Sequence, residues 1–428
     1  MKKYLLLLLV VFLTAASCKK DDKVEDDLPN EPKDEFVFDV DWTANTVYFD
    51  ENSLSDLVKV DTANYRYYFK DSNTDAAGLS TGNIIVIHGL ALRKVVSVSH
   101  TGSQYVVTTE YATMNEAIEN GKVEWDYGVN FKNASTARLS VGGKSYSFRK
   151  AGTNALEIKL SLNGYDYLIK MELKDNSAHV TQTIEKKVNG NVNAKFICEG
   201  DIKTFRVANK MKFENAELTS YSNDNKNLEG ELTVSLVVAG SGNDNVNFEF
   251  PTTILTFLFN VGPIPVKVNV KVLFVINSVV PGAGSSEISA KFKYNSSTGI
   301  SYSTSAGVKS TGSKGSYSME KKKAQTGAPG AISVNFGLGF PRIEVETFGE
   351  VLVPWAQTAF LIGGDYTFNP ACQKAQAAYI GAIGYKLKFL GQSNEGSKTL
   401  WNETKVLLKS GGCKGGMSFE QSLEQLKK

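Results

Sequence analysis

Hydrophobic and polar residues alternate along most of this chain, in the pattern of β-strands. In PVKVNVKVLFVI, residues 265–276, Val266 and Val268 point to one face and the lysine and asparagine side chains to the other. A period of two predicts an antiparallel sheet with one buried and one solvated face. Residues 155–162 and 166–173 flank an Asn-Gly-Tyr turn, which predicts a hairpin because Asn-Gly favours positive φ.

The N-terminal part of the chain has shorter strand patterns and one helix signal. NIIVIHGL at 83–90 is a nearly continuous β-branched run, which predicts a strand buried on both faces. Thr113 and Glu116 have the spacing of a helix capping box, and Gly121 is placed to end that helix. We therefore predict a small β module at 36–125 that carries one short helix. Its strands are expected at 36–42, 65–70, 83–90, 93–100 and 104–110.

Strand patterns separated by turns continue through residues 126–428, without long helix-period segments between them. This organisation predicts an all-β fold, either an antiparallel sandwich or a curled barrel-like sheet. The large antiparallel β domain at 126–428 is one sandwich or two smaller domains, and the sequence leaves both open.

The first residues read MKKYLLLLLVVFLTAASC, a basic start, an apolar run and small residues before a cysteine. This order predicts a signal peptide at 1–17, because the apolar run is too short to span a bilayer. The small residues that end in Cys18 resemble the lipobox of bacterial lipoproteins, with Ala15 where most have Leu. The resemblance implies that Cys18 carries a lipid and attaches the protein to a membrane.

Residues 18–35 are rich in charge and poor in aliphatic side chains, which predicts a disordered tether. Lys19, Lys20, Asp21 and Asp22 directly follow the predicted anchor. They resemble the acidic export signal of Bacteroidetes surface lipoproteins. That resemblance implies an outer-membrane protein, lipid-anchored and exposed on the cell surface.

The segment TGNIIVIHGLALRKVVSVSHTGSQYVVTTEYATMNEAI is similar to part of a loose group of secreted, β-rich bacterial proteins. The shared pattern runs from Gly82 and Asn83 through Gly89–Val95 to Thr109–Ala117, with departures at Ala91 and Tyr111. The strand FNVGPIPVKVNVKV resembles a second segment of that group. The resemblance implies a modular secreted architecture and no particular activity.

Charge and cysteine content narrow the classes of partner. The chain has 47 basic and 45 acidic residues, and this balance argues against nucleic acid as a partner. Cys372 and Cys413 are candidates for a disulfide in an oxidising compartment, with Cys198 left unpaired; three reduced thiols are the alternative. The sequence predicts no cofactor.

Few residues form patterns with recognisable chemistry. His88 and His100 on neighbouring strands, with Glu110, have the residue types of a zinc site, but ordinary core or surface histidines are favoured. Glu344 and Glu346 share one strand face, whereas the two carboxylates of a glycosidase normally face each other across a cleft. We predict no catalytic residue and no metal site.

Five aromatic residues are candidates for stacking on a ligand such as a sugar: Trp42, Trp125, Tyr127, Trp355 and Trp401. The leading hypothesis is a non-catalytic surface protein with a binding, adhesion or structural role and a glycan or protein ligand. The alternative is handling of lipid or another apolar ligand in the periplasm, in a cavity lined by 250–259 and 272–280. A polysaccharide hydrolase that uses Glu344 and Glu346 is a third hypothesis.

Overall fold

The computed structural model describes most of the chain from Lys33 onward. Asp34–Lys428 forms one compact unit. The predicted signal peptide and nearly all of the predicted tether, including Cys18, lie outside the described residues. Among the described residues, no helix has the length and apolar character needed to span a bilayer. The described residues are 33–141, 144–162, 164–188, 191–241, 244–280, 283–327, 332–348, 352–368, 371–389, 392–412, 419, 422, 424 and 425.

The larger of two main sheets is antiparallel and branches at its longest strand, β17 (Glu217–Ser241). The first half of β17 pairs with β16 and the second half with β15, while β20 pairs along its other edge. In spatial order the strands are β1 (Glu35–Trp42), β8 (Ile118–Val129), β16 (Phe205–Glu214), β17, β15 (Asn191–Lys203), β14 (Ser177–Val188), β13 (Tyr165–Leu173), β12 (Ala155–Leu162) and β11 (Arg149–Lys150), with β20 (Ala283–Ser303) and β21 (Gly307–Gly327) beside β17.

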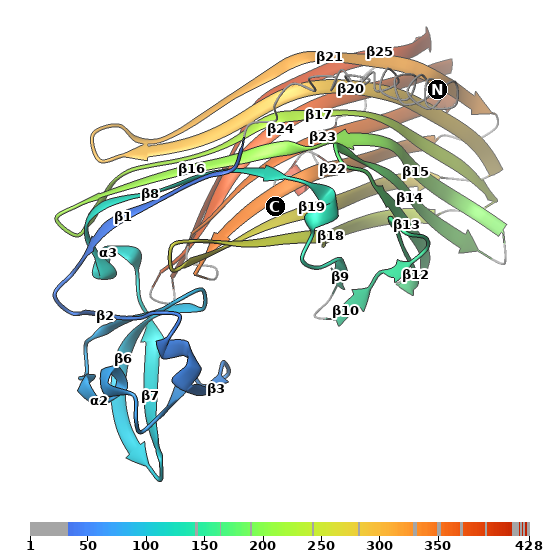
Figure 1. Cartoon of the computed structure of the whole chain (residues 1–428). Helices are drawn as coiled ribbons and strands as arrows, with labels where there is room; N and C mark the ends of the chain where they lie inside the picture. Colours follow the sequence, from blue (N-terminus) through green and yellow to red (C-terminus); the bar gives the residue numbers. More distant parts are fainter. Residues whose placement is uncertain are drawn as a thin grey trace, which may run out of the picture. The chain divides into compact units, whose positions relative to one another are not determined.

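A second antiparallel sheet packs against the first, and both curl (Figure 1). The main core lies between them, where Phe196 packs on Phe336 and Phe292 on Phe360 with ring centres 4.9 and 5.0 Å apart. The predicted all-β fold with curled sheets is confirmed. The strands of this sheet are β18 (Asp244–Val261), β19 (Ile264–Val280), β22 (Ile332–Thr347), β23 (Leu352–Phe368), β24 (Ala371–Phe389) and β25 (Gln392–Gly411).

The small module has its own sheet and its own core. Its strand order is β2 (Thr46–Phe49), β5 (Ile84–Ile87), β6 (Ala91–Thr101), β7 (Gln104–Tyr111), β4 (Arg66–Lys70) and β3 (Leu57–Asp61), with helices η1 (Ser53–Asp56), α2 (Thr74–Gly78) and α3 (Met114–Ala117). The predicted β6–β7 hairpin is present, and all four residues of β5 are buried, as the β-branched run predicts. A short helix, η2 (Phe131–Asn133), and a two-stranded ribbon, β9 (Arg138–Val141) with β10 (Lys144–Ser147), complete the described elements.

The module is inserted between two neighbouring strands of the larger sheet. β1 and β8 pair with each other from Glu35↔Asp126 to Trp42↔Ile118. The chain leaves the sheet after β1 to form the module and returns to it at the start of β8. These two points are adjacent, because the Thr43 N–H donates to the Ala117 carbonyl (2.9 Å). The range predicted for the module, 36–125, therefore contains two strands that pair as part of the larger sheet.

The structure corrects the role of Gly121. Helix α3 ends at Ala117, and Gly121 lies within β8 opposite Val40. Its φ is +127°, and a Cβ there would come within 2.2 Å of the Asp39 carbonyl oxygen. Glycine is needed at this position for the close approach of β1 rather than to end the helix.

Candidate ligand-binding cavity

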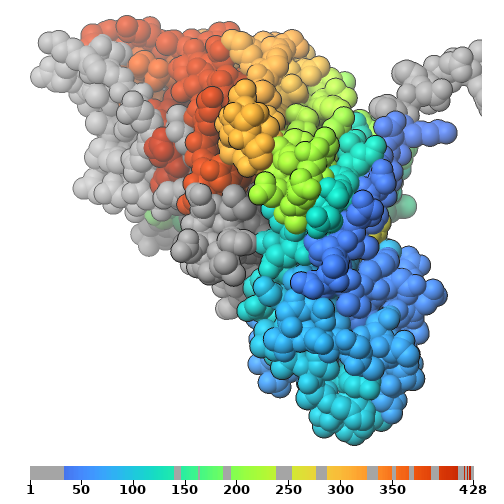
Figure 2. Space-filling view, turned by 90° about the vertical axis from the view of Figure 1, so that its left-hand side faces the viewer, coloured from blue at the N-terminus to red at the C-terminus, as the bar shows by residue number. Residues whose placement is uncertain are grey.

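An apolar cavity of about 640 Å³ lies between the two main sheets. It is at the end where the β16–β17 and β20–β21 hairpins turn, and this volume is in the range of small-molecule sites. Figure 2 looks toward this end, with the yellow-green β16–β17 strands and the orange β20–β21 strands side by side above the blue and cyan module. The lining residues are Leu92, Ala112, Thr113, Met114, Asn115, Asn209, Met211, Phe213, Leu218, Tyr221, Ile300, Tyr302, Val308, Val345, Thr347, Phe348, Pro354 and Tyr385.

Helix α3 of the inserted module contributes one wall of this cavity. Its predicted capping box is present: the Thr113 N–H donates to Glu116 Oε2 (2.9 Å), and Lys94 Nζ donates to Glu116 Oε1 (3.1 Å). Burial acts to raise the pKa of Glu116, but the Thr113 and Lys94 contacts outweigh it and lower the pKa. Both carboxylate oxygens of Glu116 thus hold the short helix in place, and Met114 on this helix lines the cavity.

The cavity runs from an exposed rim to a buried inner end. Val308 at the rim is 52% exposed, whereas Met211 and Asn209 are 4% and 2% exposed. Phe213 lies next to the β16–β17 turn, at the open end of the cavity. Asn209 is four residues farther from this turn, which corresponds to about 13 Å along the strand. Alternation on β16 places Val207, Asn209, Met211 and Phe213 on the same face, so Asn209 is a polar residue at a core position.

Two polar side chains meet at the inner end. Asn209 Nδ2 donates to the Tyr221 hydroxyl (3.1 Å), while Asn209 Oδ1 is buried and has no partner within the described residues. Burial raises the pKa of Tyr221, against the opposite effect of the Asn209 contact, so this hydroxyl keeps its proton. The described lining residues include no Asp, Glu, Lys, Arg or His. The cavity is therefore built for an uncharged occupant, because a buried charge without a partner is costly.

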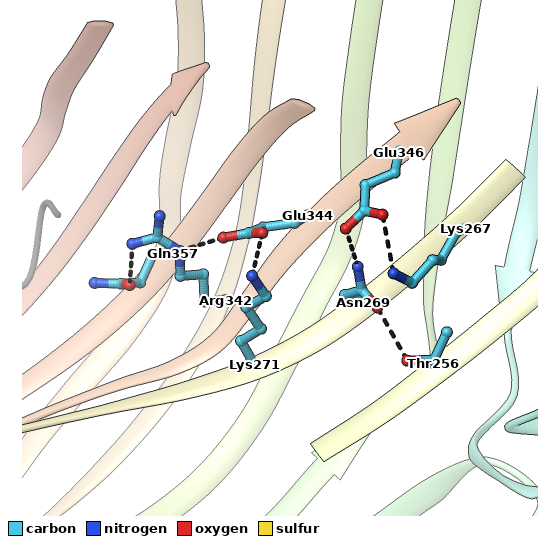
Figure 3. Close-up of polar contacts among 8 residues, drawn as sticks. All are labelled: Thr256, Lys267, Asn269, Lys271, Arg342, Glu344, Glu346 and Gln357. Carbon is cyan, nitrogen blue, oxygen red and sulfur yellow. Dashed lines mark hydrogen bonds and ion pairs between the residues drawn. The ribbon is translucent and has the colours of Figure 1, made fainter. Parts of the chain in front are cut away.

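Glu344 and Glu346 lie elsewhere, on the face of the second sheet that is turned away from the main core (Figure 3). Glu344 contacts Lys271 and accepts from Arg342 Nε (3.0 Å), and Glu346 accepts from Lys267 Nζ (2.9 Å) and Asn269 Nδ2 (2.6 Å). Burial acts to raise the pKa of Glu344, but Lys271 and Arg342 outweigh it and lower the pKa.

Glu344 is therefore held as an anion by its neighbouring cations, and Glu346 forms an ion pair with Lys267. A glycosidase acid needs the opposite environment, one that raises its pKa so that it can donate a proton near neutral pH. The same cluster corrects the expectation that this face of β19 is solvated, because Asn269 is only 2% exposed. Ion pairing across β19 and β22 is a structural role for these residues.

The five candidate aromatics lie outside the cavity lining. Trp125, Trp355 and Trp401 are buried, and the Arg342 guanidinium covers the Trp355 ring at 4.2 Å. Tyr127 stacks on Phe259 (ring centres 4.2 Å apart), and Trp42 packs beside Phe38 and Tyr48. Aromatic rings that do face the cavity belong to residues the sequence did not single out: Phe213, Tyr221, Tyr302, Phe348 and Tyr385.

The histidines are placed separately. His88 Nδ1 lies 2.7 Å from the Tyr48 hydroxyl and its Nε2 3.2 Å from Glu51, whereas His100 packs on Tyr105. His179 on β14 lies 3.2 Å from Asp201 and 3.7 Å from Glu199 on the neighbouring strand β15. Within the described residues, no group of three or more His, Cys, Asp or Glu side chains is arranged to hold a metal ion.

The cysteines differ in their surroundings. Cys372 is disulfide-bonded, and its cross-strand neighbour is Gly411. Cys413 lies outside the described residues, so the Cys372–Cys413 pairing stays a prediction. Cys198 is free and buried in the main core, and burial raises the pKa of its thiol.

Lys19, Lys20, Asp21 and Asp22 also lie outside the described residues. No protein-family model, curated protein or solved structure matches the chain at a significant level. The site must therefore be interpreted from its own geometry.

The cavity residues were missed at the sequence level because they come from many separate elements. The apolar strands expected to line a cavity instead fill the core: Ile254, Phe257 and Phe274 are fully buried there and do not line it. One signal was present in the sequence. Asn209 interrupts the apolar face of ANKMKF at a position whose neighbours two residues away are core residues.

Proposed function

We propose that this protein is a non-catalytic binding protein that holds an apolar, lipid-like ligand between its two main sheets. The observation that carries the proposal is the cavity of about 640 Å³, with apolar walls and no charged residue among its described lining. Pockets of this size and composition bury most of the surface of a small ligand, and that burial supplies the affinity. Of the hypotheses that the sequence leaves open, the cavity favours the handling of apolar ligands.

Two exposed valines provide a matched test. Val308 lies at the cavity rim and is 52% exposed, and Val406 on β25 is 51% exposed and outside the lining. We expect Val308→Trp to narrow the entrance and weaken binding of the dye Nile red about tenfold or more, with Val406→Trp unchanged. Fluorescence titration measures both, and mass spectrometry of an organic extract identifies any co-purified lipid. Failure of the unmodified protein to bind the dye or any lipid would contradict the proposal.

The location of the protein is a separate proposal. The lipobox-like segment supports a lipid on Cys18, and the charged residues after it support export to the outer face of the outer membrane. A cavity for apolar ligands is consistent with a protein held at a membrane surface, where such ligands are concentrated. Adhesion and glycan binding stay predictions, because no described feature favours them over the cavity.

A further inference from the structure

The inner end of the cavity has hydrogen-bonding capacity that the protein does not use. Asn209 lines the cavity and is 98% buried, with its Oδ1 lacking a partner in the described part of the chain. Its Nδ2 is occupied by the oxygen of Tyr221, whose hydroxyl still has its own proton to donate. An unmet acceptor and an available donor are therefore adjacent at the end of a mostly apolar space.

The unused capacity continues into the neighbouring strand. Asn223 on β17 lies directly opposite Asn209 in the sheet register and is 2% exposed. Its Nδ2 also has no partner in the described structure. Buried polar groups are rarely left unpaired, since each costs roughly 1–3 kcal/mol. Asn223 lies outside the described cavity lining, whereas Asn209 Oδ1 lines the cavity, where a ligand or an ordered water can complete it.

We propose that the ligand is a neutral amphiphile whose hydroxyl group reaches Asn209 and Tyr221, while its hydrocarbon part extends toward α3 and the rim. This inference rests on the proposed function and specifies its ligand class. A hydroxyl donates to Asn209 Oδ1 and accepts from Tyr221 at the same time. The preference for a hydroxyl follows from the orientation in which Asn209 Nδ2 faces Tyr221, because this orientation leaves an acceptor, Oδ1, unmet.

Other head groups fit this end less well. An ether or ester can only accept a hydrogen bond and leaves Asn209 Oδ1 unmet. A carboxylate can only accept, and the described lining provides no cation to neutralise it. An alkane satisfies neither group. Ordered water is the competing occupant, and with water in place the protein would not distinguish an alcohol from its ether.

The test compares decanol, decyl methyl ether and decanoate as competitors of Nile red on the purified full chain. We expect decanol to displace the dye at about tenfold lower concentration than the ether, the ratio that corresponds to one or two net hydrogen bonds. Asn209→Leu, which replaces the amide by an apolar side chain of similar size, should remove this ratio. Tyr221→Phe, which keeps the ring, should reduce the ratio.

The outcomes separate this inference from the proposed function. Equal displacement by decanol and the ether, or a ratio unchanged in Asn209→Leu and Tyr221→Phe, overturns the hydroxyl site while the apolar cavity stands. Tighter binding of decanoate overturns it in favour of an anionic ligand. If neither the dye nor any competitor binds, the proposed function itself fails.

Discussion

Glu344 is of a residue type found in catalytic sites, but its surroundings are those of a structural ion pair. The carboxylate is buried between Lys271 and Arg342, and Arg342 in turn covers Trp355. Removal of one member of such a group leaves an uncompensated charge in the interior, which is more costly than the net value of the pair. The residue is therefore expected to matter for stability.

We predict that Glu344→Gln lowers the free energy of unfolding by about 3 kcal/mol, because Lys271 and Arg342 lose their counter-charge. The folded state favours the carboxylate, so its contribution is present above pH 4.5, the ordinary pKa, and is lost as the pH falls below that value. Denaturant unfolding between pH 3 and pH 7 measures both effects. Glu320→Gln, at an exposed pair with Lys322, is the control and should cause a much smaller loss. An equal loss in both variants would contradict the structural role.

At this scale the sequence identifies residue types but not their neighbours. Two glutamates on one strand face are visible in RIEVETF, but their cations come partly from β19, about seventy residues earlier. Conversely, nothing marks Tyr221 as a cavity residue until β16 and β17 are paired. Environment depends on sheet register, and register between distant segments is not encoded in local pattern.

Helix α3 is the element that joins the inserted module to the cavity. It has only four residues, too few for intrinsic stability, so it depends on its cap and its packing. The Thr113–Glu116 spacing predicted the cap correctly because capping is local. The end of the helix was predicted wrongly, because the glycine taken as a stop signal serves the β1–β8 pairing instead.

We predict that Glu116→Ala destabilises the protein by about 1 kcal/mol, because the Thr113 N–H and Lys94 lose their shared acceptor. The same variant should raise the dissociation rate of Nile red, since α3 forms a cavity wall. Glu110→Ala on β7 is the matched control, because Glu110 is exposed and lies outside both the capping contacts and the cavity lining. Stopped-flow fluorescence measures the dissociation rate of the dye, and thermal unfolding measures the loss of stability. Unchanged release in Glu116→Ala would show that the wall is independent of the cap.

At the scale of the whole molecule, the strand content and curled sheets followed from periodicity and turns. The insertion did not, because β1 and β8 are ordinary alternating segments whose pairing becomes apparent only in space. The cavity is also a property of the whole, since its lining combines the module with both sheets. For this reason, binding sites in folds built from distant strand pairs are not predicted by local sequence pattern.

The proposed anchor is a whole-molecule property that can be tested in cells. We predict that the unmodified protein incorporates labelled fatty acid and is cleaved by proteinase added to intact cells. Cys18→Ala should lose the label and leave the membrane fraction. Asp21→Ala with Asp22→Ala should keep the label but become protected from proteinase. Protection of the unmodified protein until the cells are lysed would place it in the periplasm and contradict surface export.

The contact between Thr43 and Ala117 has a consequence for the order of folding. Strands β1 and β8 are separated by roughly 75 residues, so their pairing in an unfolded chain requires closure of a long loop. The module has its own buried core around Phe49, Phe69 and Val107, and its ends meet. Once the module has folded, β1 and β8 become the arms of an effectively short hairpin. The free-energy cost of closing the loop between them then falls by about 3 kcal/mol. We expect that early folding of the inserted module would bring β1 and β8 at the edge of the larger sheet together.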